Sequence, residues 1–464
     1  MAGSALALAA CVPTMAAAPN PAAPDTLATA RSFDAPPAAW PADQWWRAYN
    51  DPQLDTLMEE GLEGSPTLAI ASARVAQAQA NLQSTESLRL PSADAQAAVH
   101  TARISANATG LPQSLHPALP QGWNDQGQVG LGLAYQLDFF GRNRAAFAAA
   151  TSDVRAAEAE AASARLQLST AIALAYADLQ RLAADRAAAE EIVRLREQSL
   201  ALVQQRYDSQ LEHEGQLAQA RSELASARSD LIAVEGNLRR ARYVMATLLG
   251  RGPDRGLDIA LPANVRVAPL GAPADINAEL IGRRPDLVAA RVRAEAASRR
   301  IDVARADFYP NVNLTALVGL QSIGLDVLSE GGSRFGQVGP AVTLPIFSGG
   351  RIEGAYRGAR AEYDASVALY DQTLIHALNE VADAIAARRT LDTQLIEARA
   401  ALAASEQSYR IARHRYEGGL SPYIEVLTVE NRLVQHRRAL ATLETQAFVL
   451  DVALVRALGG GFNS

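Results

Sequence analysis

Histidine, cysteine and lysine, which carry much of the metal and nucleophile chemistry of proteins, are sparse in this 464-residue chain. The six histidines show no His-Glu-x-x-His spacing and are scattered at positions 100, 116, 213, 376, 414 and 436. Protein zinc sites are usually built from closely spaced histidines or paired cysteines. The run Glu212-His213-Glu214 is more typical of a solvated turn than of a cation site. We therefore predict no metal site and no soluble cofactor.

Lysine is absent, so all 43 basic residues are arginine. This excludes a phosphate-loop lysine, a Schiff base and a lysine general base. The glycine-rich stretch from Gly250 to Gly256 has neither a lysine nor a following apolar helix, so it is not a phosphate cradle. The net charge is -7, without a basic cluster that would favour nucleic acid. We predict that the chain is not an enzyme.

The single cysteine, Cys11, directly follows a small-residue apolar segment. This arrangement is typical of a bacterial lipoprotein signal, in which the cysteine becomes the lipidated first residue. We expect residues 1–10 to be a signal peptide, Cys11 to carry palmitate and diacylglycerol, and residues 11–43 to form a lipidated linker. No arginine precedes the apolar segment, which points to a start codon further upstream.

An internal repeat organises the rest of the chain. Residues 142–250 align without gaps on residues 351–459, and Ser65-Pro66-Thr67-Leu68 aligns on Arg284-Pro285-Asp286-Leu287 in a second register. We expect a first structural repeat over residues 44–250, an equatorial connector over residues 251–276 and a second repeat over residues 277–464. Each repeat has the order medium helix, strand, loop, strand, long helix, turn and medium helix.

Four segments alternate apolar residues with small or polar ones, as half-exposed strands do. They cover about 93–107, 127–140, 311–322 and 336–347, although the alternation in the first is weak. Segments of about ten residues with this pattern suit a membrane-spanning β-barrel, and a half-buried soluble sheet is the alternative. Four strands cannot close a barrel, and open strand edges do not occur in lipid. Membrane strands here would require several chains to share one barrel.

Long proline-free runs between these strands predict unusually long helices. The six predicted helices cover about 65–89, 142–208, 214–250, 284–308, 351–417 and 421–458. The two longest would each extend ~100 Å, and their apolar residues follow coiled-coil spacing. Asp138, Gly141, Gly349 and Gly350 mark the strand-to-helix junctions. A plain soluble coiled coil is the alternative, and the junctions with barrel-type strands argue against it.

With these residues assembled, the chain resembles the TolC-like outer membrane factors, specifically the lipoprotein branch that provides outer membrane channels for RND-type efflux systems. The resemblance covers nearly the whole chain and rests on five motifs: Trp45-Trp46 with Asp51-Pro52-Gln53-Leu54, Leu137 to Arg142, Arg283-Arg284-Pro285-Asp286, Leu344 to Arg351, and Ala457 to Gly461.

The resemblance implies a mixed α/β membrane protein that assembles as a homotrimer. Four strands from each chain would close a 12-stranded outer membrane β-barrel, continued into the periplasm by a long antiparallel coiled-coil α-barrel. The implied partners are outer membrane lipids, a periplasmic adaptor (membrane fusion) protein and an inner-membrane RND-type pump. The implied location is the bacterial outer membrane, with a lipid anchor.

The same resemblance implies a gate at the periplasmic ends of the coiled coils. Tyr416 and Glu425 match the family's aromatic and acidic gate positions, whereas Ser421 replaces a family arginine, Thr428 replaces a second acid and Gln216 replaces an aspartate. We therefore expect a hydrogen bond between Tyr416 and Gln216 in place of a salt-bridged lock. Three copies of Glu425 around a narrow axis would repel one another or attract cations.

A further departure from the family pattern affects the turn between the first pair of coiled-coil helices. Gln210 occupies the position of the tip glycine there, which leaves the geometry of this turn open. Tyr423 is either part of the gate or a hydrophobic contact for the pump or adaptor.

The function that follows is a passive exit duct for drugs or other small toxic compounds. A duct for type I polypeptide secretion on the same fold is one alternative, and palmitate labelling of Cys11 discriminates between them because secretion ducts usually lack the lipid signal. A non-transporting periplasmic coiled-coil scaffold, whose trimers would form no pore in a bilayer, is the other alternative.

Overall fold

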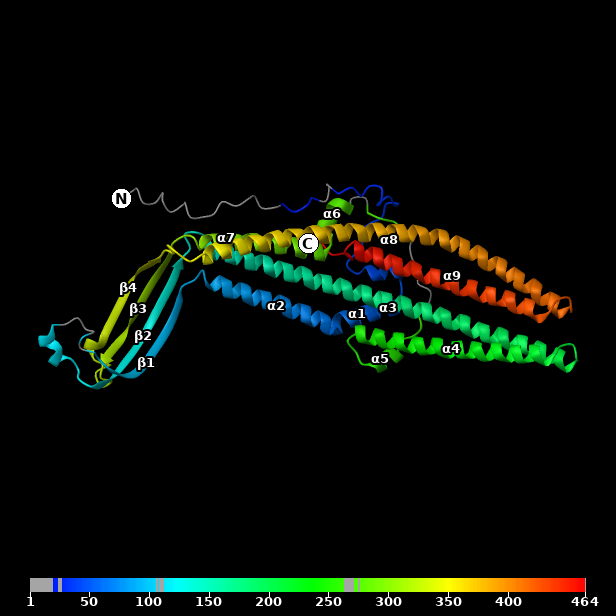
Figure 1. The fold of residues 1–464 in the computed structure, drawn as a ribbon, viewed down its shortest axis with the longest axis horizontal. Helices are drawn as coiled ribbons and strands as arrows, with labels where there is room; N and C mark the ends of the chain where they lie inside the picture. The colour runs from blue at the N-terminus through cyan, green and yellow to red at the C-terminus, as the bar shows by residue number, and fades with distance from the viewer. Residues whose placement is uncertain are drawn as a thin grey trace. The chain divides into compact units, whose positions relative to one another are not determined.

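The structure is a computed structural model that describes residues 20–23, 27–105, 107, 112–262, 271–273 and 276–463. The predicted signal peptide and Cys11 lie outside the described residues. The chain divides into two compact units, and we describe each by itself. The strand unit contains Val75–Ala156 and Ala290–Leu369, and the helix unit contains Ala22–Arg74, Ala157–Ala289 and Tyr370–Ser464. Figure 1 labels the elements of both.

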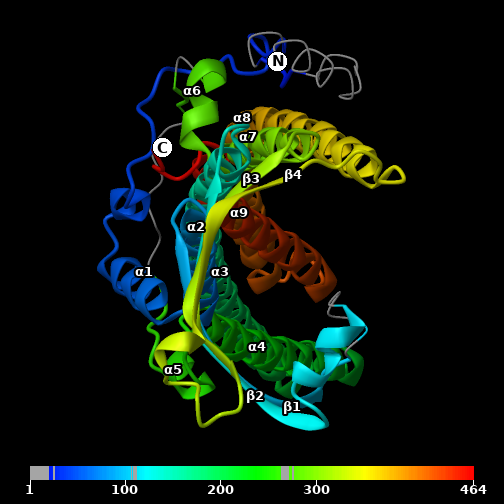
Figure 2. The same cartoon turned by 90° about the vertical axis from the view of Figure 1, so that its left-hand side faces the viewer.

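The strand unit contains one antiparallel four-stranded sheet with the order β1-β2-β3-β4. Its strands are β1 (Ser92–Arg103), β2 (Trp123–Leu137), β3 (Asn311–Ile323) and β4 (Arg334–Thr343). The sheet is strongly twisted, as Figure 2 shows. These four strands confirm the sequence prediction, although β1 and β4 end four residues earlier than the 107 and 347 expected. β4 ends at Thr343, whose ladder partner Asn311 is the first residue of β3.

The two faces of the sheet differ as the alternation predicted. Leu131 pairs with Val318 across the β2–β3 ladder and with Ala95 across β1–β2, so all three lie on one apolar face. Val129, Leu131 and Leu133 remain 46–48% exposed. The opposite face carries Gln128, Gly130, Gly132, Ala134 and Gln136. A contiguous exposed apolar face of this kind marks a surface that another molecule or a lipid phase covers.

Four helices begin or end at the sheet and belong partly to each unit. They are α2 (Pro66–Ser87), α3 (Arg142–Asp208), α7 (Pro285–Ala306) and α8 (Arg351–Glu417). Both α3 and α8 contain 67 residues and have the predicted bounds. Within the strand unit, Arg300 of α7 binds Asp153 of α3 at 2.7 Å and Glu362 of α8 at 3.2 Å, which ties three helices together.

The strand-to-helix junctions are held by one carboxylate and by left-handed backbone. Asp138 accepts hydrogen bonds from the backbone N–H groups of Asn143 at 3.2 Å and Arg144 at 2.9 Å, so it satisfies free donors at the start of α3. Gly141 has φ +79°, and Gly349 and Gly350 have φ +57° and +84° before α8. The chain changes direction at these residues, which sequence analysis had marked as junctions.

The remaining helices belong wholly to the helix unit. They are η3 (Trp45–Tyr49), α1 (Pro52–Gly64), α4 (Glu214–Leu248), α5 (Pro253–Leu257), α6 (Ile276–Arg283) and α9 (Tyr423–Ala457). Two short 3₁₀ segments, η5 (Gln113–Ala118) and η6 (Gly331–Ser333), lie in the loops of the strand unit. None of the described helices combines the length and apolarity needed to cross a membrane.

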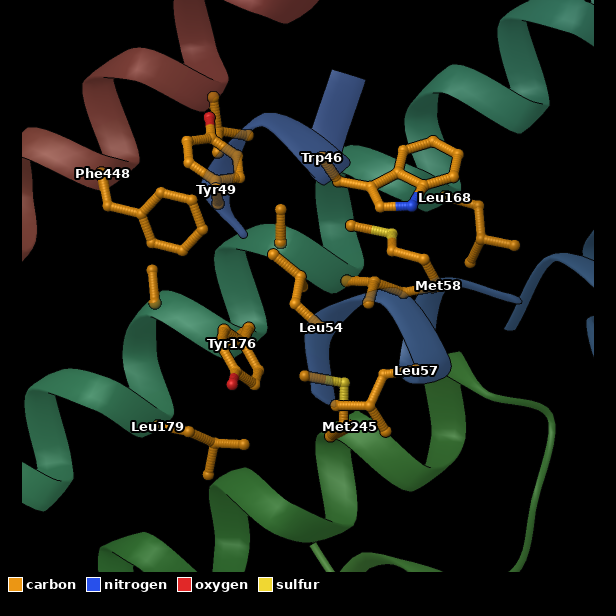
Figure 3. Close-up of a cluster of buried hydrophobic side chains, with 14 of the residues drawn as sticks. Trp46, Tyr49, Leu54, Leu57, Met58, Leu168, Tyr176, Leu179, Met245 and Phe448 are labelled. Carbon is orange, nitrogen blue, oxygen red and sulfur yellow. The ribbon is translucent and has the colours of Figure 1, made fainter. Parts of the chain in front are cut away.

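The main core of the helix unit forms where the Trp45-Trp46 and Asp51-Pro52-Gln53-Leu54 motifs pack on α3, α4 and α9 (Figure 3). Trp45 and Trp46 meet edge to face, and Tyr49 meets Phe448 in the same way at 4.7 Å. The Asp51 side chain accepts from the backbone of Gln53 and Leu54 at the start of α1, as an N-cap does, and also accepts from the Tyr176 hydroxyl at 2.7 Å.

The internal repeat appears in three dimensions at two equivalent glycines. Gly250 and Gly459 follow α4 and α9 with φ +70° and +91°. A β-carbon at Gly250 would lie 2.4 Å from the carbonyl oxygen of Gly64, and one at Gly459 would lie 1.9 Å from that of Arg283. Gly64 and Arg283 are themselves equivalent in the sequence repeat. Each repeat therefore joins its two medium helices by the same close backbone contact.

We predict that Gly459→Ala destabilises the helix unit. The methyl group would clash with the Arg283 carbonyl and would also require a strained backbone, which together should cost about 2 kcal/mol or more. Gly358→Ala in the exposed interior of α8 is the matched control, because its β-carbon would meet no atom within 4 Å. Thermal unfolding in detergent should show a lower melting temperature for the first variant only, and equal melting temperatures would contradict the close contact.

Candidate functional site

The two helical hairpins of the helix unit, α3–α4 and α8–α9, end in turns with the same backbone structure. Gln210 has φ +58° and its repeat equivalent Gly419 has φ +71°. Leu211 donates to the Arg206 carbonyl, and Leu420 donates to the Arg415 carbonyl, each at 2.8 Å. This bond pattern closes a helix end through one left-handed residue. Gln210 therefore adopts the glycine-like turn that the sequence left open.

An apolar cluster joins the two hairpins just above these turns, and we call it the tip cluster. Its members come from α3, α4, α8 and α9, and they are Val203, Leu217, Ala220, Tyr416, Tyr423, Val426 and Leu427. The rings of Tyr416 and Tyr423 lie 5.7 Å apart, and each residue is at most 2% exposed. Tyr423 is thus part of the internal packing of this chain.

A charged cluster of Arg206, Glu212 and Tyr416 spans the hairpins at the edge of the tip cluster. The Arg206 Nε atom lies 3.3 Å from Glu212 Oε1, and the Tyr416 hydroxyl donates to the same oxygen at 3.1 Å. The Arg206 guanidinium also stacks over the Tyr416 ring at 4.8 Å from its centroid. Burial, and then the neighbouring Glu212 carboxylate, raise the pKa of Tyr416, so its hydroxyl keeps its proton as a donor.

The expected hydrogen bond between Tyr416 and Gln216 is wrong, because the Tyr416 hydroxyl binds Glu212 instead. Gln216 Oε1 and Ser421 Oγ are buried and find no hydrogen-bond partner among the described residues. Thr428 donates to the Ile424 carbonyl at 2.7 Å within its own helix. Glu425 is exposed at the start of α9. The five residues singled out by resemblance therefore lie at the ends of the two hairpins but do not form one bonded network.

A second charged pair connects the hairpins further along the helices. Arg196 of α3 lies 3.3 Å from Glu430 of α9, and their side chains are 5% and 0% exposed. Arg196 also donates to Asn431 Oδ1 at 2.5 Å, and Ser199 donates to Glu430 at 3.5 Å. Removing one partner of a buried ion pair leaves an uncompensated charge, so this pair fixes how α9 packs on α3.

Burial dominates the electrostatics around Glu430. It raises the pKa of the carboxyl group, and Arg196 offsets only part of that effect. Tyr409 and Tyr423 face the same region, and their pKa values are raised first by burial and then by the Glu430 charge. Keeping Glu430 ionised where α9 packs on α3 therefore costs free energy.

This arrangement can control how the two hairpins pack against each other. Polar groups bridge two hairpins that end in neighbouring turns, so changing their charges changes how the hairpins pack. Within the described part of the chain no group of three or more His, Cys, Asp or Glu side chains is placed to hold a metal ion.

Sequence reasoning missed Arg196, Arg206, Glu212 and Glu430. A signal existed for Glu430, because it occupies an apolar helical stripe with Tyr423, Val426, Leu427 and Leu433, and all five are buried. No comparable signal existed for Glu212, whose position in a turn gives no indication of the direction of its side chain.

Comparisons with known proteins agree with the fold. The family model described as outer membrane efflux protein matches residues 57–251 and 278–460. The chain is 30% identical over 452 residues to the multidrug resistance outer membrane protein MdtP of Escherichia coli K12, covering 95% of this chain and 91% of the relative. It is also 30% identical to the solvent efflux pump outer membrane protein SrpC of Pseudomonas putida, covering 89% and 87% of the two chains.

Among solved structures, the outer membrane protein VceC of Vibrio cholerae is similar over 91% of this chain and 100% of its own, with 40% identity and a TM-score of 0.84. The chain therefore belongs to the outer membrane efflux protein family. It is an outer membrane efflux channel, which confirms the predicted family, fold class and outer membrane location and leaves the non-transporting scaffold without support.

The raised pKa of Glu430 predicts a pH dependence whose sign follows from proton binding. The folded chain binds this proton more tightly than the unfolded chain does, so this group adds stability as the pH falls through the folded pKa toward the unfolded pKa. Glu430→Gln lacks the titrating proton. The free energy of unfolding of the wild type should therefore rise relative to that of the variant as the pH is lowered toward the unfolded value of 4.5, by about 1.4 kcal/mol for each unit by which the folded pKa exceeds the unfolded one.

Thermal unfolding in detergent at stepped pH measures this difference. Glu444→Gln is the control, because it removes an exposed carboxylate from the same helix and leaves the buried pair intact. If both variants showed the same pH-dependent difference from the wild type, or if Glu430→Gln showed none, burial of Glu430 would not be its source.

Proposed function

We propose that this chain is the exit duct of a tripartite efflux pump, through which drugs or other small toxic compounds pass passively from the periplasm to the exterior. The observation that carries the proposal is a sheet with an exposed apolar face joined directly to two 67-residue helices. The names of the relatives add support, since MdtP is a multidrug resistance protein and SrpC belongs to a solvent efflux pump. Transport energy comes from partner proteins.

The working unit in this proposal is a homotrimer with a 12-stranded barrel. β1 and β4 are the edge strands of the sheet in one chain, and edge strands cannot stay unpaired in lipid. The periplasmic partners are an adaptor protein and an RND-type inner-membrane pump. Cys11 carries the lipid anchor, as palmitate and diacylglycerol.

Deleting the gene and measuring growth with a panel of dyes, detergents, antibiotics and metals tests the function. We expect several-fold greater susceptibility to some small compounds, because without the duct they accumulate in the periplasm. The wild-type gene should restore resistance. Unchanged susceptibility together with loss of a polypeptide from the medium would favour the secretion duct instead, and palmitate labelling of Cys11 gives an independent measure of the lipid anchor.

In this proposal the duct is gated where the hairpins end. The Arg206–Glu212–Tyr416 cluster holds the α3–α4 hairpin against the α8–α9 hairpin, and movement of one past the other opens the duct. A hydrogen bond to a charged group contributes about 1.5–3 kcal/mol, and 1.4 kcal/mol corresponds to a tenfold change in an equilibrium. One such cluster in each chain is therefore sufficient to bias the resting duct toward the closed state.

We predict that Glu212→Gln raises the conductance of the purified protein in planar bilayers. The amide cannot hold Arg206 as an ion pair, so the open fraction should increase on the order of tenfold. Glu214→Gln is the matched control, because Glu214 is exposed at the start of α4. This variant should behave as the wild type does. A wild-type conductance for Glu212→Gln would remove the cluster from the gate.

The same recordings test the proposed ring of three Glu425 carboxylates. Glu425→Gln should weaken block by divalent cations, because the ring loses the charge that attracts them. Divalent block of wild-type strength in this variant would leave Glu425 as an ordinary exposed glutamate, while the result for Glu212 would stand on its own.

A further inference from the structure

A basic cleft lies at the strand-to-helix junction of the strand unit, between the start of α3 and the end of α7. Its volume is about 560 Å³, within the range of small-molecule sites. The residues that matter for its chemistry are Phe140, Arg144, Arg299, Asp302, Arg305 and Tyr309. The proposed gate does not use this cleft.

The cleft carries more positive than negative charge. Arg299 has a loose ion pair with Asp302 at 3.8 Å, and Arg144 has one with Asp138 at 3.5 Å. Arg305 is exposed and forms no ion pair with any residue that the structure describes. One guanidinium group is therefore uncompensated, and the other two are held weakly. Guanidinium groups offer paired N–H donors that match the oxygens of a phosphate group.

An aromatic pair lines the same cleft. The rings of Phe140 and Tyr309 stack with centroids 4.8 Å apart and planes 12° from parallel, although Phe140 is still 46% exposed. Aromatic residues are enriched where membrane barrels meet the headgroup region, because their rings suit a boundary between apolar and polar surroundings. The cleft thus combines phosphate-binding donors with an interfacial aromatic surface.

Helix geometry indicates that the cleft opens on the lipid side. The Arg142–Asp307 ion pair lies beside Gln136, Asn311 and Thr343, which belong to the polar face of the sheet. Arg144 is two positions after Arg142 in α3, and two residues correspond to a rotation of about 200°. Arg144 therefore projects away from the polar face of the sheet, and Arg305 lines the same cleft with it.

We propose that this cleft binds the phosphate headgroup of a glycerophospholipid in the periplasmic leaflet of the outer membrane. The arginines hold the phosphate oxygens, and the Phe140–Tyr309 pair contacts the glycerol and the first acyl carbons. The site uses the outer membrane location of the family and goes beyond the duct. It would fix the height of the barrel against the headgroups, where the strands end.

Native mass spectrometry of the full-length protein in mild detergent, with phosphatidylglycerol as the probe, tests the site. We expect the wild type to retain the phospholipid and to release a neutral diacylglycerol with the same acyl chains. The double variant R144Q/R305Q should retain several-fold less phospholipid. R155Q/R291Q removes two exposed arginines from the same helices outside the cleft and should retain as much as the wild type.

Three results would overturn the proposal: equal phospholipid retention by both double variants, equal retention of diacylglycerol, and complete displacement by excess inorganic phosphate, which would indicate a free-anion site.

R144K/R305K keeps the charge and should regain part of the binding, which separates loss of the site from loss of folding. Bilayer conductance of R144Q/R305Q should match the wild type, so failure here would leave the proposed duct intact.

Discussion

Hydrogen bonding along strand edges is the constraint on which this architecture depends. In hydrocarbon each unsatisfied backbone group costs several kcal/mol. The ladders satisfy β2 and β3 on both sides, whereas β1 and β4 each have one neighbour within the chain. A sheet of this kind is stable in an outer membrane only when other copies complete it. The long helices α3 and α8 meet the same constraint in a different way, because their backbone hydrogen bonds form within each helix. They therefore need no neighbouring strand and can extend into water.

Much of this fold could be predicted because its determinants are local. Alternation at Leu131 and Leu133 assigns the apolar face of β2, and the proline-free runs that begin at Arg142 and Arg351 indicate the long helices α3 and α8. The equivalence of Gly250 and Gly459 was also visible in the sequence repeat, and the structure adds the reason for it, a carbonyl oxygen packed where a side chain would stand. The strand ends were less predictable, since they depend on which backbone groups find partners across the ladder.

The charged contacts between the hairpins were not predictable in the same way. Resemblance matched Tyr416 to the family's aromatic gate position, but it chose Gln216 as the partner because that position replaces a family aspartate. The Tyr416 hydroxyl reaches Glu212 in the adjoining turn. Which side chain fills that place depends on how two hairpins pack, and a pattern within one helix does not contain that information. Glu430 shows the intermediate case, in which a charged residue on an apolar stripe signals burial without naming Arg196 as its partner.

The turn at Gln210 has a consequence for the symmetry of the molecule. Its backbone and hydrogen bonds match those at Gly419, yet a residue with a side chain occupies left-handed backbone at a cost of about 1–2 kcal/mol. The helix-closing bonds therefore determine the shape of this loop, and glycine only makes that shape easier to reach. The two hairpins thus have equal lengths and the same turn hydrogen bonds but differ in the conformational cost of the turn. After local unfolding, the turn of the α3–α4 hairpin therefore re-forms less favourably than that of the α8–α9 hairpin.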